Sequence, residues 1–137
     1  MMNFLLSRSI FLLWVIVLLL SQESALASAN QTKIMNDVKS CPYNISEYVR
    51  GVFDCSNMAA MLYDWLSEKG HRCRVVYIEN WTYDIKHNFI FVDGYAVEPT
   101  TKDWAWWYYN KWITIDKIIY LKRQQMRGPG FTYPHRW

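Results

Sequence analysis

The feature that most constrains the fold is an Asp93-Gly94 pair between two short apolar runs. Residues 87–92 read HNFIFV and residues 95–98 read YAVE, so both runs have the composition of β-strands. Asp-Gly between such runs indicates a two-residue hairpin turn, because both positions of a type I′ turn need a positive φ. The sequence therefore predicts an antiparallel hairpin that ends before Pro99.

An amphipathic helix is predicted ahead of this hairpin. From Cys55 onward, apolar residues recur every three or four positions, which places them on one buried face. Asp54 stands where an N-cap residue is expected, and Gly70 stands where a C′ glycine is expected. The residues of the buried face are Met58, Met61, Leu62, Trp65 and Leu66.

Two further segments complete the predicted architecture. Residues 73–78 are rich in β-branched side chains and are predicted to form a strand. Residues 113–121 fit a strand or a short helix equally well. These elements together predict an α+β fold in which the helix packs on a small antiparallel sheet.

Composition excludes several classes of protein. A chain of 137 residues that is 52% hydrophobic can form one domain with a core and is not disordered. Its net charge of +3 is too small to indicate nucleic-acid binding. The three cysteines are too few for a disulfide framework and lack zinc-site spacing, so no metal and no cofactor is predicted.

The N-terminal residues have the pattern of a secretory signal. Arg8 precedes an apolar run over residues 10–20, and an Ala-x-Ala cleavage site ends at residue 27. Apolar residues begin at Phe4, which leaves an uncleaved membrane anchor as the alternative. In both cases the remainder of the chain is expected to be secreted or otherwise extracytoplasmic.

The expected organisation has four parts. Residues 1–27 form the signal or anchor, residues 28–43 a lead-in segment, residues 44–126 the domain, and residues 127–137 an irregular tail. Export makes glycosylation at Asn-x-Ser/Thr sites relevant. The candidate sites are Asn30, Asn44 and Asn80.

Three residues carry the predicted chemistry. Cys55 begins the helix, where free backbone N–H groups and the helix dipole favour a thiolate and can hold an oxyanion. The two-residue turn places His87 and Glu98 on one face of the hairpin as diagonal neighbours, roughly 7–8 Å apart at the backbone. Glu98 can span that gap and orient the imidazole, as the acid of a catalytic triad does. The alternative is a structural role for all three.

The pattern around these residues resembles the transglutaminase-like superfamily, whose core is papain-like. In that superfamily a nucleophilic cysteine opens a helix that ends in glycine before a strand, and a histidine, an Asp-Gly hairpin and Asp-Pro-Thr follow. The resemblance covers residues 44–101. It departs twice, because Glu98 replaces the usual aspartate and because Asn88-Phe89-Ile90 follows His87 where Trp-Val is usual. The matching segments are 53–59 (FDCSNMA), 69–70 (KG), 72–76 (RCRVV), 87 (H), 93–94 (DG) and 98–100 (EPT).

The resemblance implies that Cys55, His87 and Glu98 form a triad that acts through a thioester. Resolution by water gives a peptidase or amidase, and resolution by an amine gives a cross-linking acyltransferase. We expect hydrolysis, because the large cross-linking members carry flanking domains and calcium sites that have no counterpart in these 137 residues. Inactive members exist, so a silent module that binds envelope polymer is the alternative. The backbone N–H of Cys55 is one candidate oxyanion donor, and the sequence selects no second one.

The other cysteines and histidines are given structural roles. With Cys55 assigned as the nucleophile, Cys41 and Cys73 remain as a candidate disulfide, and plain buried thiols are the alternative. His71 and His135 are expected at the surface.

Six aromatic residues are concentrated within residues 104–112. Trp104, Trp106 and Trp107 are expected to form a substrate wall beside Glu98 or an interfacial belt, and packing on the core is the alternative. Basic residues predominate after residue 110, which suits an anionic polymer or a membrane surface. The expected partner is a peptide or protein substrate, with cell-envelope polymer as an option; the sequence indicates neither its identity nor the oligomeric state.

Overall fold

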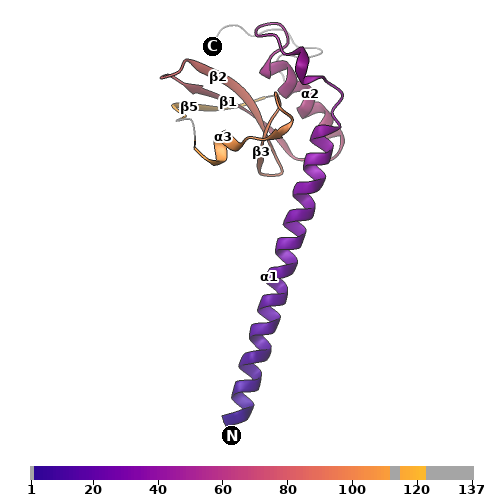
Figure 1. Ribbon diagram of the computed structural model, residues 1–137, viewed down its shortest axis with the longest axis vertical. Coiled ribbons are helices and arrows are strands. Elements are labelled where there is room, and N and C mark those ends of the chain that lie inside the picture. The colour runs from indigo at the N-terminus through magenta and orange to yellow at the C-terminus, as the bar shows by residue number, and fades with distance from the viewer. Residues whose placement is uncertain (1, 112–114, 123–137) are drawn as a thin grey trace. The chain divides into compact units, whose positions relative to one another are not determined.

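The computed structural model describes residues 2–111 and 115–122 (Figure 1). The chain divides into two compact units, residues 1–33 and 34–137, which are described separately. The elements in chain order are α1 (Met2–Lys39), a 3-10 helix (Ile45–Glu47), α2 (Cys55–Glu68), β1 (Cys73–Asn80), β2 (Ile85–Val92), β3 (Tyr95–Glu98), β4 (Asp103–Trp104), α3 (Trp106–Tyr109) and β5 (Lys117–Leu121).

The first unit consists of α1 up to residue 33. The side chains of residues 11–33 are exposed. This helix is long and apolar enough to cross a membrane, with a mean hydropathy of 1.8, and a signal sequence near the N-terminus has the same properties. The apolar helix is therefore compatible with the expected export by either route.

The expected lead-in segment, residues 28–43, belongs largely to a helix, because α1 continues to Lys39. Ile34 and Val38 lie one helical turn apart and are fully buried in the core of the second unit. The polar residues Asn36 and Asp37 between them interrupt the apolar pattern in the sequence. Residues 34–43 are thus part of the second unit and its core, whereas residues 28–33 belong to the exposed helix of the first unit.

The second unit is an α+β domain built on a five-stranded antiparallel sheet of order β4-β3-β2-β1-β5. Helix α2 packs on β1 and β2, as expected. Its N-terminus is closed by a capping box, in which the Asp54 side chain accepts from Ser56 N–H and the Asn57 side chain accepts from Asp54 N–H. Gly70 follows the helix with a φ of +85°, which a C′ glycine adopts readily.

The sheet is covered on both faces by separate apolar clusters. Val75, Ile90 and Val97 face α2 and the end of α1. The intervening residues of the same strands, among them Val76, Phe89 and Ala96, face the other way and pack with Trp107 and Tyr108 of α3. This alternation follows from the period-two geometry of strands and places α2 and α3 on opposite faces.

The hairpin and its register are confirmed. Val92 pairs with Tyr95 and Ile90 pairs with Val97, around a turn in which Asp93 and Gly94 both have positive φ. The last described segment resolves the open alternative in favour of a strand, since β5 pairs with β1. Residues 113–114 and the expected tail, 127–137, lie outside the described residues.

Candidate active site

Cys55 occupies the first position of α2, directly after the Asp54 cap. Its side chain is buried, with 8% of the residue exposed. The backbone N–H groups of a first helical turn have no partner within the helix, so the sulfur lies at the positive end of the helix dipole. The predicted placement of this cysteine is therefore confirmed.

His87 and Glu98 are joined by a short hydrogen bond. The imidazole Nε2 donates to Glu98 Oε2 over 2.6 Å, and the His87 side chain retains 19% exposure. Their positions on β2 and β3 follow from the hairpin register, so the geometry expected from the Asp-Gly turn is confirmed. Because Nε2 is engaged by the carboxylate, Nδ1 is the ring nitrogen that remains for the Cys55 thiol.

Glu98 is buried and is held by four donor groups. Its Oε2 accepts from His87 and from the indole Nε1 of Trp107, at 3.0 Å. Its Oε1 accepts from the backbone N–H and the hydroxyl of Thr100, at 3.0 and 2.6 Å. With its acceptor sites filled in this way, the carboxylate is fixed in one orientation toward the imidazole.

Electrostatics at the pair favour the ionised forms. Burial alone would lower the pKa of His87, but hydrogen bonds to Cys55 and Glu98 and the negative charges of both outweigh it and raise that pKa to about 10. Burial opposes ionisation of Glu98, whose pKa is nevertheless lowered by the hydrogen bond and charge of His87 and by Thr100. The site thus pairs a His87 imidazolium with an ionised Glu98 carboxylate at neutral pH.

We expect the His87 imidazole to stay protonated through neutral pH and to titrate near pH 10 in a nitrogen-15 NMR titration. Glu98→Gln removes one anionic partner and lowers the pKa of His87, whereas the control Glu47→Gln, at an exposed position, leaves that pKa unchanged.

The two shifted groups also make the free energy of unfolding depend on pH. The stabilisation that comes from the raised pKa of His87 is fully present below pH 6.5 and is lost as the pH rises toward 10. The Glu98 contribution is present above about 4.5 and is lost as the pH falls. Titration of His87 near pH 6.5 would contradict the ion pair.

The three tryptophans expected to form a substrate wall have different environments. Trp107 lies beside His87, with the two ring centroids 5.8 Å apart in a T-shaped arrangement. It positions Glu98 through Nε1 and packs on Phe89. Trp104 packs against the core cluster on the α2 face and against Tyr95, and Trp106 is 51% exposed. Only Trp107 therefore adjoins the candidate site.

The segment after α1 supports the loop that follows Glu98. The Tyr43 hydroxyl donates to the Pro99 carbonyl over 2.6 Å. Lys102 Nζ donates to the carbonyls of Cys41 and Tyr43 and lies 4.3 Å from the centre of the Tyr43 ring. These contacts hold the backbone on the C-terminal side of the buried carboxylate.

The expected Cys41–Cys73 disulfide is not formed, since both cysteines and Cys55 are free thiols. The Cys41 backbone carbonyl accepts from Lys102 Nζ, whereas Cys73 is the first residue of β1. Each thiol is packed among apolar residues of the core on the α2 face instead of bonding the other. Burial raises the pKa of both thiols, that of Cys73 to about 11, so both are poor nucleophiles at neutral pH.

Two other expectations for polar residues are wrong. Asn80 is not available for glycosylation, because it is 1% exposed and its side chain accepts from Tyr83 N–H at the end of β1. Asn30 and Asn44 are exposed, and no contact tests their modification. His71 is buried rather than at the surface, since its two ring nitrogens contact Asp93 at 2.7 Å and Asp37 at 3.0 Å. His135 lies outside the described residues.

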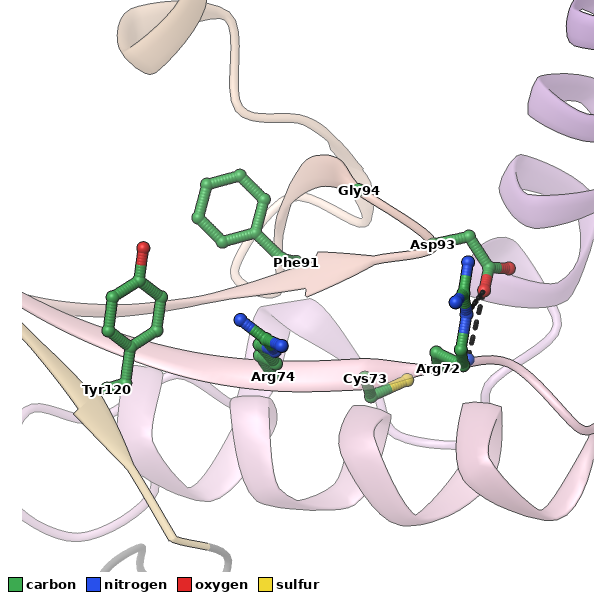
Figure 2. A pocket seen from close by; sticks show the side chains of 7 residues that line it. All are labelled: Arg72, Cys73, Arg74, Phe91, Asp93, Gly94 and Tyr120. Carbon is green, nitrogen blue, oxygen red and sulfur yellow. Dashed lines mark hydrogen bonds and ion pairs between the residues drawn. The ribbon is translucent and has the colours of Figure 1, made fainter.

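A separate cavity of about 610 Å³ lies at the other end of the sheet. Figure 2 shows Arg74, Phe91 and Tyr120 extending from the same side of their strands, with Arg72 close to Asp93 near the hairpin turn. Two guanidinium groups beside two aromatic rings can bind an anionic group. The cavity shares a face of β2 with His87, four residues away along the strand.

Sequence reasoning missed the roles of Thr100 and Asn88 and assigned Trp107 to substrate binding. Thr100 and the indole N–H of Trp107 complete the Glu98 environment, and Asn88 Nδ2 donates to Cys55 Sγ over 3.9 Å. Asn88 follows His87 on β2, and its side chain reaches Cys55 at the N-terminus of α2. The departure from Trp-Val after His87 was the available signal.

No protein-family model matches the chain, and no curated protein or solved structure matches it.

Proposed function

We propose that this protein is an exported cysteine hydrolase with a transglutaminase-like core, which cleaves amide bonds in peptides through a thioester. The observation that carries the proposal is the hydrogen-bonded His87–Glu98 pair beside a buried cysteine at a helix N-terminus. The α2 helix on an antiparallel sheet supports the proposed core. The apolar N-terminal helix supports export.

The proposed reaction uses the imidazolium of His87 as the acid. Cys55 Sγ attacks the carbonyl carbon, and the carbonyl electron pair moves onto oxygen. When this pair returns, the carbon–nitrogen bond breaks and the leaving amine takes its proton from His87 Nδ1. Neutral His87 then removes a proton from water, which attacks the thioester and releases the acid and the Cys55 thiolate.

Glu98 and its donors act on orientation and charge in this scheme. The carboxylate keeps the Nε2 proton directed away from the sulfur and stabilises the imidazolium, while Trp107 and Thr100 hold the carboxylate. The His87 side chain is 19% exposed, so solvent reaches part of the residue that would activate water. This access favours hydrolysis over transfer to an amine, which requires exclusion of water.

Iodoacetamide alkylation at pH 7 tests the proposal. We expect Cys55 to react faster than Cys41 and Cys73, whose pKa values are raised by burial, as followed by peptide mass spectrometry. His87→Ala lowers the Cys55 rate by about 10²-fold, because the thiolate loses its cationic partner. Lys86→Ala, at the exposed neighbouring position of β2, leaves the rate unchanged.

A Cys55 that is no more reactive than Cys41 would refute the hydrolase. That outcome favours a second candidate function, a catalytically silent module that binds an anionic envelope polymer. The observation behind this candidate is the cavity with two arginines and two aromatic rings.

A further inference from the structure

Asn88 is a buried polar residue in the middle of a strand. It lies on β2 between His87 and the fully buried Phe89, and only 8% of it is exposed. Its Nδ2 donates to Cys55 Sγ over 3.9 Å. Within residues 2–111 and 115–122, its Oδ1 has no hydrogen-bond partner although the atom is buried.

An incompletely bonded buried amide destabilises a fold, because the group leaves water without full compensation. Asparagine is also disfavoured in strand interiors, where β-branched and aromatic residues pack better. The amide is directed at the candidate nucleophile, and residues that reduce stability in this way are concentrated at functional sites. A catalytic role accounts for both the residue type and its direction.

We infer that Asn88 Nδ2 is the side-chain donor of the oxyanion hole, acting together with the backbone N–H of Cys55. This inference rests on the proposed hydrolase function. A carboxamide nitrogen carries two hydrogens, so contact with the sulfur leaves a second one to donate. The oxyanion is attached to the carbon that bonds Sγ, which places it next to the sulfur and within reach of this donor. The Cys55 N–H, at the first helical position, has no acceptor within the helix.

The donor acts only while the tetrahedral intermediate exists. As the sulfur–carbon bond forms, the carbonyl electron pair becomes an oxygen lone pair with a negative charge, which Nδ2–H and the Cys55 N–H stabilise. When the pair reforms the carbonyl, the carbon–nitrogen bond breaks and His87 protonates the amine. Asn88 gains and loses no proton in this sequence.

Two reactions of the same thiol test the assignment in the full chain. Acylation by p-nitrophenyl acetate passes through a tetrahedral oxyanion, whereas alkylation by iodoacetamide is a displacement at a saturated carbon and forms none. We expect Asn88→Ala to lower the acylation rate constant by about 10²–10³-fold while the alkylation rate constant stays at its wild-type value. The release of p-nitrophenolate reports the first reaction, and mass spectrometry of the Cys55 peptide reports the second.

Two further variants separate function from folding. Asn88→Leu keeps a similar volume without a donor, so it should show the same selective loss of acylation and unfold at equal or higher denaturant concentration. Asn80→Ala changes another buried strand asparagine, one that lies at the end of β1, and should leave both rate constants of the folded protein unchanged.

Equal losses in both reactions would overturn the assignment, because they would mean that Asn88 supports the thiolate rather than the oxyanion. Wild-type acylation in both Asn88 variants would overturn it as well. A wild-type protein that reacts slowly with both reagents would instead refute the proposed hydrolase, and the role of Asn88 with it.

Discussion

Cys55→Ala is expected to abolish the release of p-nitrophenolate beyond the rate of the buffer, a loss of at least about 10⁴-fold in turnover. The sulfur is the atom that forms the thioester, and the residues around it supply no second nucleophile in the proposed scheme. Cys55→Ser should be nearly as inactive, because a hydroxyl is not ionised by the neighbouring imidazolium. Mass spectrometry should detect an acylated protein only when Cys55 is present.

Cys41→Ala and Cys73→Ala are matched controls for this loss. Burial raises the pKa of each of these thiols, so neither is a good nucleophile at neutral pH. Each control variant should retain wild-type turnover per folded molecule. Turnover that persists in Cys55→Ala and disappears in a control variant would show that the nucleophile has been misassigned.

Phe89→Ala is expected to lower the free energy of unfolding by about 3–5 kcal/mol in a urea titration. Phe89 is fully buried, and its ring contacts those of Phe91, Trp107 and Tyr108. Such a loss is a large fraction of the roughly 5–15 kcal/mol that stabilises a typical domain. Trp107 also loses a packing partner 5.2 Å away, so its hydrogen bond to Glu98 should weaken.

Phe89→Leu provides the graded control for this variant. It retains most of the buried apolar volume and should cost clearly less than the alanine substitution. A cost below about 1 kcal/mol for Phe89→Ala would contradict the assignment of this ring to the core on the α3 face.

The parts of the fold that depend on neighbouring residues could be predicted from the sequence. The Asp54 cap and Gly70 bound α2, and Asp93-Gly94 set the register that brings His87 to Glu98. Each of these signals acts over a few residues, so no knowledge of the remaining chain is needed to interpret it.

The errors concern relations between distant segments. His71 is buried because Asp37 and Asp93 contact it from 34 and 22 positions away in the chain. The helical character of residues 34–39 depends on a core that the sheet and α2 complete. The Cys41–Cys73 pairing relied on elimination, which contains no information on where the strands place each thiol.

The candidate site was likewise only partly predictable. Its reacting groups are residue types with known chemistry, but Trp107 was assigned to substrate and instead holds a carboxylate. Asn88 was visible only as a departure from the superfamily pattern. Its direction toward the sulfur depends on the packing of α2 against β2, which the sequence does not specify.

The contacts of Tyr43 and Lys102 determine where a shortened version of this protein can begin. A fragment that starts at residue 44 omits the ring and the two carbonyls that hold the loop after Glu98, together with the buried residues Ile34 and Val38. Fragments for recombinant production should therefore start at or before Ile34, the first residue of the second unit. Such a fragment removes the apolar helical unit and keeps the contacts of His87 and Glu98 described above.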